Sequence, residues 1–133
     1  MNGTAERQGP PPYEPAIRAV PMPADANQNG DIFGGWVLAQ MDIAGGLVAA
    51  HRAQGRVATV AITAMTFHQP VMVGDAVSFY GEVTRVGRTS IAVKIEAWVR
   101  RGLGEERIKV TEGLFTFVAI GPDRRPRPVP QFP

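Results

Sequence analysis

The chain has 133 residues, of which 44% are hydrophobic and 20% are charged, and its formal net charge is +2. This length favours one domain with a single core, and the small charge, without a basic stripe interleaved with aromatic residues, argues against a nucleic-acid-binding protein. The absence of cysteine excludes disulfides, thiolate nucleophiles and cysteine-type zinc sites, and two histidines without metal-ligand spacing give no reason to expect a metal.

The chain begins with a polar, Pro-rich segment, residues 1–12, which has no periodic apolar pattern and is expected to be disordered. One domain is expected over residues 13–121, followed by a Pro- and Arg-rich tail at 122–133 that we expect to be solvated. Residues 14–22 predict a short extended segment, which its prolines limit to an edge strand or an irregular strand. The sequence has no apolar run long enough to span a membrane, and together with the lack of cysteine this favours a cytoplasmic location.

The rest of the sequence is organised around one predicted helix, which ends near Gln54. Residues 27–31 read Asn-Gln-Asn-Gly-Asp, a composition typical of turns and helix caps, and Gly34 and Gly35 follow where the helix should begin. Because no side chain screens their backbone N–H groups, this end of the helix could polarise an oxygen atom.

The predicted helix is apolar on nearly every side from Trp36 to Ala50, which indicates that it is buried all round. Asp42 interrupts this pattern, with no Lys or Arg at helical spacing to neutralise it. Since burying an unpaired charge is costly, Asp42 must reach a polar cleft, water or a ligand, or else pair with a distant Arg or a donor from another subunit. Gly45 and Gly46 each weaken a helix interior, so they indicate that something large packs close to them.

After the helix the hydrophobic period changes from 3.6 to 2, which predicts four long strands. The first, residues 57–68, is rich in β-branched residues and is expected to carry Thr59, Thr63 and Phe67 on one face. The other strands are predicted at 76–86, 90–101 and 107–120. One buried helix followed by an antiparallel meander predicts an α+β fold in which a curved sheet wraps around the helix.

A single sheet on one helix leaves apolar surface uncovered. Trp98, on the otherwise polar side of its strand, and the second face of residues 57–68 are the surfaces that we expect an oligomer to use. The sequence therefore predicts at least a dimer.

Five segments in the right order closely resemble the hotdog-fold acyl-CoA thioesterases, in particular the short YciA-like acyl-CoA hydrolases. The first joins Ala-Asn-Gln-Asn-Gly-Asp-Ile-Phe-Gly-Gly-Trp to Met-Asp-Ile-Ala-Gly-Gly, and the others are residues 60–70 with Phe67-His68, then 73–75, 86–90 and 115–118. The resemblance covers residues 17–120. It implies a hotdog dimer whose two sheets join edge to edge, usually assembled into a trimer of dimers, a homohexamer, with active sites at the dimer interface.

The resemblance also implies an activity, the hydrolysis of acyl-CoA to coenzyme A and a carboxylate without a metal or other cofactor. By motif, Asp42 falls on the helix acid that serves as general base or nucleophile. Asp31 falls where many relatives place Asn or Asp, facing the thioester from the other subunit. An ionised Asp31 cannot donate the hydrogen bond that Asn supplies at this position.

Thioester chemistry and helix geometry together predict a site that two chains share. The N–H groups of Gly34 and Gly35 would hold the oxyanion, but Asp42 lies about two turns further on, roughly 12 Å by the helical rise. We therefore expect Gly34, Gly35 and Asp31 of one chain to face Asp42 of the other. Asp42 would activate water or attack directly to give a mixed anhydride, and the sequence does not separate the two.

Further substrate contacts are expected from residues that also have plain structural explanations. The threonines at 59 and 63 could position Asp42 or the pantetheine amide. The turn at 87–90 resembles the family's turn near the CoA phosphates, or it is a simple hairpin. The aromatic residues at 33 and 36 belong to the core or form a wall of the acyl tunnel. The candidate substrate-binding residues are Asn27, Phe33, Trp36, Thr59, Thr63, Gly87, Arg88, Thr89 and Ser90. His68 is expected to be structural.

Two alternatives stay open at this point. A non-catalytic acyl-CoA binding or sensing module could use the same fold, although it would gain nothing from an unpaired Asp42. A hotdog hydratase or dehydratase would need a histidine working with the acid, and His68 is its only candidate. The acyl chain-length preference, the physiological substrate and the choice between hexamer and tetramer are not encoded in any local pattern.

Overall fold

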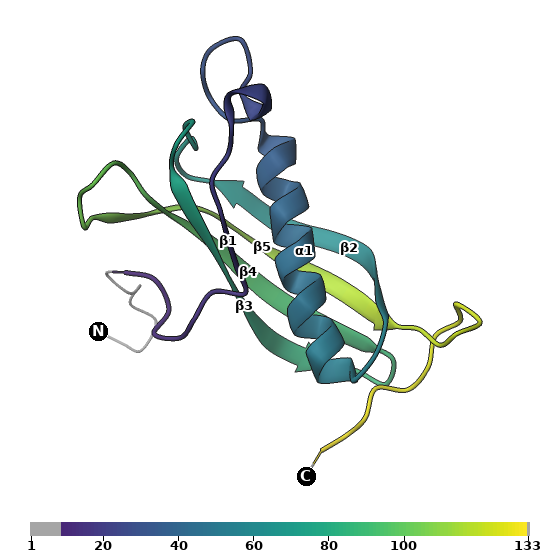
Figure 1. Ribbon diagram of the computed structural model, residues 1–133. Helices are drawn as coiled ribbons and strands as arrows, with labels where there is room; N and C mark the ends of the chain where they lie inside the picture. Colours follow the sequence, from purple (N-terminus) through teal and green to yellow (C-terminus); the bar gives the residue numbers. More distant parts are fainter. Residues whose placement is uncertain (1–8, 133) are drawn as a thin grey trace.

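The fold places one long helix against one five-stranded antiparallel sheet (Figure 1). The computed structural model describes residues 9–132, so most of the segment expected to be disordered lies outside the described residues. The elements are β1 (Ile17–Ala19), a 3₁₀ turn η1 (Pro23–Asp25), α1 (Gly34–Ala53), β2 (Val57–Phe67), β3 (Ala76–Val86), β4 (Ser90–Arg100) and β5 (Arg107–Ala119). They confirm the predicted helix and the four predicted long strands, each of which ends within one residue of its expected limit.

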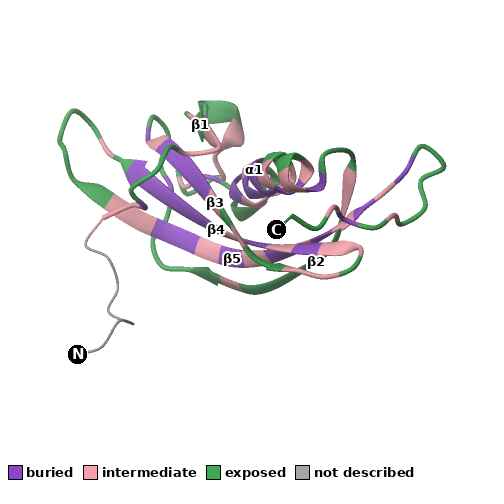
Figure 2. Cartoon of the chain, turned by 90° about the horizontal axis from the view of Figure 1, so that it is seen from below, coloured by how far each residue is buried: buried purple, intermediate pink, exposed green. Residues whose placement is uncertain are grey.

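The strand order across the sheet is β1-β3-β4-β5-β2, which leaves β1 and β2 as the two edge strands. The short edge strand predicted within residues 14–22 is therefore confirmed as β1. Seen from one end, the sheet runs as a shallow curve beneath α1, and β2 is mostly exposed (Figure 2). This matches the predicted curved sheet packed on a helix.

The core lies between α1 and one face of the sheet, with Met41 and Phe117 among its fully covered side chains. In β4 the predicted inward positions are all buried: Ile91, Val93, Ile95, Ala97 and Val99. A Cβ atom built at Gly45 would come 2.6 Å from Ile95 Cδ1 and 2.9 Å from Phe117 Cζ. This confirms that close packing requires glycine at 45, whereas at Gly46 the nearest atom is 3.9 Å away.

The expectation that α1 is buried all round is wrong within the single chain. Ile43 and Leu47 are 52% and 53% exposed, because the sheet covers only one side of the helix. Val60, on the neighbouring edge strand β2, is 57% exposed. The uncovered apolar surface therefore lies along one side of α1 and along β2.

The expectation that Thr59 and Thr63 share a face is also wrong. The register of β2 against β5 shifts between Thr59 and Ala61 and again between Thr63 and Thr66. Each extra residue in a β-bulge reverses the alternation of the side chains that follow it. Thr63 consequently pairs with Leu114, while its hydroxyl contacts the Leu114 carbonyl at 3.5 Å.

Two further surface expectations are corrected. Trp98 is only 6% exposed, and its Nε1–H donates to Glu96 at 2.9 Å, so Trp98 is covered by its own chain and leaves no face for a partner. The C-terminal tail is not simply solvated, because Val129 is buried and Arg127 donates to the carbonyl of Ala53 at the end of α1.

Candidate active site

Asp42 projects from the middle of α1 towards the edge strand β2. It is half-buried, and its Oδ1 accepts a hydrogen bond of 2.6 Å from the Thr59 hydroxyl. Among residues 9–132, no Lys, Arg or His forms an ion pair with this carboxylate. The prediction that Asp42 has no cationic neighbour in its own helix is confirmed, and no distant Arg in the described range pairs with it. Asp42 is thus a carboxylate held in place by one hydroxyl.

The loop before α1 is shaped by Asn27. Its Oδ1 accepts the backbone N–H groups of Asn29, at 2.8 Å, and Asp31, at 3.2 Å, while its own N–H donates to the Asp31 carbonyl. Gly30 supplies the positive φ of 90° that this tight loop requires. The side chain of Asn27 is therefore occupied in positioning Asp31.

The first turn of α1 leaves two backbone donors exposed. Gly34 and Gly35 are both exposed, and within the described part of the chain neither amide N–H has a hydrogen-bond partner. A Cβ atom at Gly35 would meet nothing within 4 Å, and one at Gly34 would meet only Phe67, at 3.6 Å. Packing within the chain thus leaves room for a side chain at Gly35, which contrasts with the tight fit at Gly45.

An open cavity of about 400 Å³ lies beside this helix N-terminus. Asn27, Asp31 and Gly34 line it from the loop and α1, and Phe67 and Val71 line it from the chain at the end of β2. Asp42 does not line it, since it lies eight residues after Gly34 on the same helix. One chain therefore brings Asp31 and the exposed donors together but leaves Asp42 elsewhere, as helix geometry predicts.

The remaining predicted residues lie in different parts of the chain. Phe33, expected in the core by default, is 52% exposed next to the helix N-terminus, whereas Trp36 is half-buried with its ring 6.4 Å from that of Phe79. Thr59 contacts Asp42, but Thr63 does not. A role of Phe33 as a wall of an acyl tunnel stays a prediction.

The turn between β3 and β4 is closed by the Gly87 N–H, which donates to the Ser90 carbonyl at 2.8 Å. Arg88 is exposed, and Thr89 and Ser90 are half-buried. The turn lies at the end of the sheet near the C-terminus of α1, opposite the end with the cavity (Figure 1). The Arg88 carbonyl accepts from Val129, so the C-terminal tail supports this turn, a contact that no local sequence pattern indicated.

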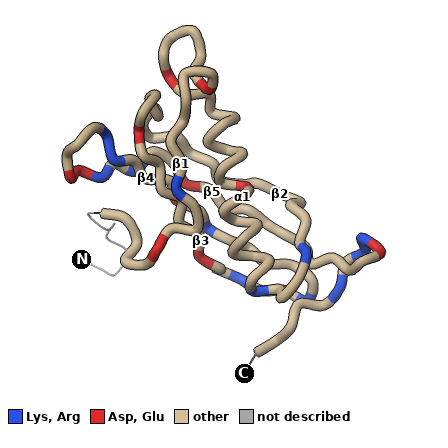
Figure 3. Tube along the Cα trace, viewed as in Figure 1, with Lys and Arg blue, Asp and Glu red and all other residues tan. Residues whose placement is uncertain are grey.

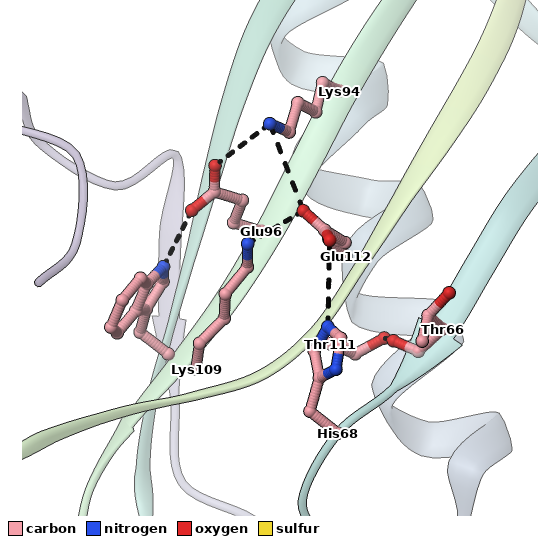
Figure 4. Close-up of polar contacts among 8 residues, drawn as sticks. Thr66, His68, Lys94, Glu96, Lys109, Thr111 and Glu112 are labelled. Carbon is pink, nitrogen blue, oxygen red and sulfur yellow. Dashed lines mark hydrogen bonds and ion pairs between the residues drawn. The ribbon is translucent and has the colours of Figure 1, made fainter. Parts of the chain in front are cut away.

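His68 belongs to a charged network on the outer face of the sheet (Figure 4). Its Nε2 lies 3.7 Å from Glu112, which accepts a 2.8 Å hydrogen bond from Lys109. The hydrogen bond from Lys109, helped by the charges of Lys109 and Lys94, holds the pKa of Glu112 below its usual value against the opposing effect of burial. His68 also lines the cavity beside Asp31 and Gly34, so the expectation that it is structural stays a prediction.

Neither a metal centre nor a membrane span is found in the described part of the chain. Its His, Asp and Glu side chains form no group of three or more that could hold a metal ion. Its helices include none that is both long and apolar enough to cross a membrane.

Comparison with known proteins gives consistent matches. The family model described as the thioesterase superfamily matches residues 29–105, a range that contains Asp31, Gly34, Gly35, Asp42 and Thr59. The chain is 50% identical over 123 residues to the acyl-CoA thioester hydrolase YciA of Salmonella typhimurium, covering 90% of this chain and 92% of the relative.

Solved structures show the same fold. A hexameric thioesterase from Yersinia pestis matches with a TM-score of 0.87 at 47% identity, covering 92% of this chain and 99% of that one. A hexameric hotdog fold thioesterase of Campylobacter jejuni matches with a TM-score of 0.85 at 38% identity, covering 89% and 91%.

Proposed function

This chain belongs to the thioesterase superfamily as a YciA-like enzyme of the hotdog fold, and from that membership we propose that it hydrolyses acyl-CoA thioesters to coenzyme A and a carboxylate. The observation that carries the proposal is Asp42, a half-buried carboxylate on an apolar helix, which the Thr59 hydroxyl orients and no cation of the described chain neutralises. A carboxylate of this kind is available to take a proton or to attack a carbon.

In the general-base route, Asp42 removes a proton from water as the water oxygen attacks the thioester carbonyl carbon. The exposed N–H groups of Gly34 and Gly35 donate to the oxyanion as it forms, at the positive end of the helix. The tetrahedral intermediate then collapses, the carbon–sulfur bond breaks, and coenzyme A leaves as a thiolate. In the alternative route Asp42 attacks the thioester carbonyl carbon directly, the carbon–sulfur bond breaks, and coenzyme A leaves as a thiolate. Water then hydrolyses the resulting mixed anhydride to the carboxylate and restores Asp42.

The protein functions as a homo-oligomer in this proposal. One chain separates Asp42 from its own Gly34 by eight residues of helix, so a second chain supplies the donors that face each Asp42. The unpaired edge of β2, with the exposed side chain of Val60, lies on the side of the molecule where Asp42 meets Thr59. We propose that dimers form along this side and assemble into a trimer of dimers.

The turn at 87–90, with the exposed Arg88, is proposed to contact the CoA phosphates, and Phe33 and Trp36 to contact the acyl chain. The chemistry written above needs only water and the protein groups, so no cofactor is proposed. A cytoplasmic location, expected from the sequence, stays a prediction.

The experiment that tests the function measures thiol release from short, long and aromatic acyl-CoAs by the wild type and by Asp42→Asn. We expect turnover by the wild type and a loss of about 10²–10⁴-fold in kcat for the variant, the usual contribution of a general base. Coenzyme A binding and the oligomeric state, measured in parallel, should not change. A wild type that binds acyl-CoA but releases no thiol would instead identify a binding or sensing module.

A further inference from the structure

A second cavity, of about 90 Å³, lies on the outer face of the sheet, the face that does not contact α1. It is lined by Arg18 from β1, Ser78 and Tyr80 from β3, Trp98 and Arg100 from β4, and Arg107 from β5. Asp42 projects from α1, on the other side of the sheet. This cavity is therefore separate from the candidate active site.

The strand register explains why three arginines meet here. Arg100 on β4 pairs directly with Arg107 on β5, so two like charges face each other across the ladder. Arg18 on β1 pairs with Ser78 on β3, and its Nε donates to the Ser78 hydroxyl at 2.8 Å. Like charges placed directly opposite in a sheet destabilise it.

None of the three guanidinium groups pairs with a carboxylate within residues 9–132. The Arg107 side chain donates to the backbone carbonyl of Glu105, at 2.9 Å, and the Arg100 side chain has no hydrogen bond to any described residue. The neighbouring Arg101 shows the contrast, because it donates to both carboxylate oxygens of Asp75.

The buried acid Glu96, on the neighbouring strand β4, is already engaged. Glu96 accepts from the Trp98 indole and lies 3.6 Å from Lys94, so it is held within the charged network of Figure 4. At the hairpin that joins β4 and β5, basic and acidic positions stand close together (Figure 3), but the acidic Glu105 and Glu106 do not line the cavity. The cavity thus concentrates positive charge, and no acidic residue of the described range 9–132 lines it.

We propose that this cavity binds a phosphate-type dianion. Guanidinium groups match phosphate oxygens with paired N–H donors, and the Ser78 hydroxyl adds a further polar group to the wall. The volume suits a single phosphate group. A bound dianion would neutralise the opposed pair Arg100–Arg107 and link the edge strand β1, through Arg18, to β4 and β5.

The test measures the thermal unfolding midpoint of the full chain as inorganic phosphate is added, with sodium chloride holding the ionic strength constant. We expect phosphate to raise the midpoint of the wild type and of Arg125→Gln, which removes the same charge from the exposed tail. In Arg100→Gln we expect the apparent affinity for phosphate to fall at least tenfold, while its midpoint in chloride alone stays equal to or above that of the wild type.

Two sources could supply the dianion, free phosphate or the phosphomonoester of a larger molecule. A parallel titration with adenosine 3′-phosphate separates them, and only the response lost in Arg100→Gln is assigned to the cavity. If phosphate and the ester raise the unfolding midpoint equally at the same concentration, the ligand is identified as free phosphate. If the ester gives the same rise at a tenfold lower concentration, the ligand is identified as a phosphomonoester. A phosphate response no larger than that of chloride, or one that survives unchanged in Arg100→Gln, overturns the proposal.

Discussion

Thr59 donates a 2.6 Å hydrogen bond to Asp42, joining the edge strand β2 to the middle of α1. The bond fixes one oxygen of the carboxylate in a helix whose other side chains at this level are apolar. Because Thr59 lies before the first bulge of β2, it faces the helix, whereas Thr63 lies after that bulge and does not. The position of the bulge thus decides which of two threonines serves Asp42.

Replacing Thr59 by Val should lower kcat by about 10–100-fold, because a hydrogen bond to a charged group contributes about 1.5–3 kcal/mol. The measurement is thiol release from acyl-CoA at saturating substrate. The matched control is Thr63→Val, which makes the same change four residues along on the other face of β2 and should retain nearly full activity. Equal losses of activity in both variants would show that the substitutions disturb β2 itself, and that the loss does not come from the missing hydrogen bond to Asp42.

A site shared between chains predicts complementation. Mixed and reassembled Asp42→Asn and Gly35→Pro chains should regain activity, since a mixed dimer holds one site with both Gly35 and Asp42 intact. Random pairing gives mixed dimers in half of the population, so about a quarter of wild-type activity is expected. Each variant alone should be inactive, and a mixture that regains nothing would place both groups in one chain.

Two glycines of α1 should separate stability from activity. Gly45→Ala should destabilise the fold by about 1 kcal/mol net, since overpacking against Ile95 and Phe117 outweighs the better helix propensity of Ala. In Gly35→Ala the added methyl group meets no atom of the chain within 4 Å, so the stability should not fall. The activity should fall, because the methyl group would screen the N–H that is proposed to hold the oxyanion. Urea unfolding and thiol release, measured on both variants, check this contrast.

Glu112 should make stability depend on acid. Its folded-state pKa lies below the ordinary value of 4.5, chiefly through the hydrogen bond from Lys109, so its contribution is present above that value and is lost as the pH falls through the folded-state pKa. Glu112→Gln should therefore be less stable than the wild type at neutral pH, with the difference shrinking below pH 4.5. Urea unfolding across this range, with the exposed Glu14→Gln as control, tests the sign.

The tail should stabilise the end of α1. Arg127 donates to the carbonyls of Ala53, at 2.9 Å, and Ile120, at 3.2 Å. Arg127→Ala should lower the free energy of unfolding by about 1.5–3 kcal/mol, the usual range for hydrogen bonds that involve a charged group. Arg125→Ala, which removes an exposed arginine from the same segment, should change it by less than about 0.5 kcal/mol.

Some features could be predicted from the sequence because they depend on local patterns. The change of hydrophobic period located α1 and the long strands, and the lack of a cation at helical spacing singled out Asp42. The five family-like segments identified the hotdog fold and the thioesterase family, which the matched residues 29–105 confirm.

Other features depended on contacts between distant parts of the chain. The bulges of β2 follow from its register with β5, and they moved Thr63 away from Asp42. Trp98 is covered although its strand alternation suggested exposure, and the side of α1 with Ile43 and Leu47 is left open although its composition suggested full burial.

The sequence by itself determined the elements, the fold family and the isolated carboxylate, because each is written in neighbouring residues. Only the tertiary structure decided which threonine reaches Asp42, which glycine is required by packing, and where Arg18, Arg100 and Arg107 converge. The physical reason is that strand register and the curvature of a sheet are set by all the strands together, so no single segment encodes them.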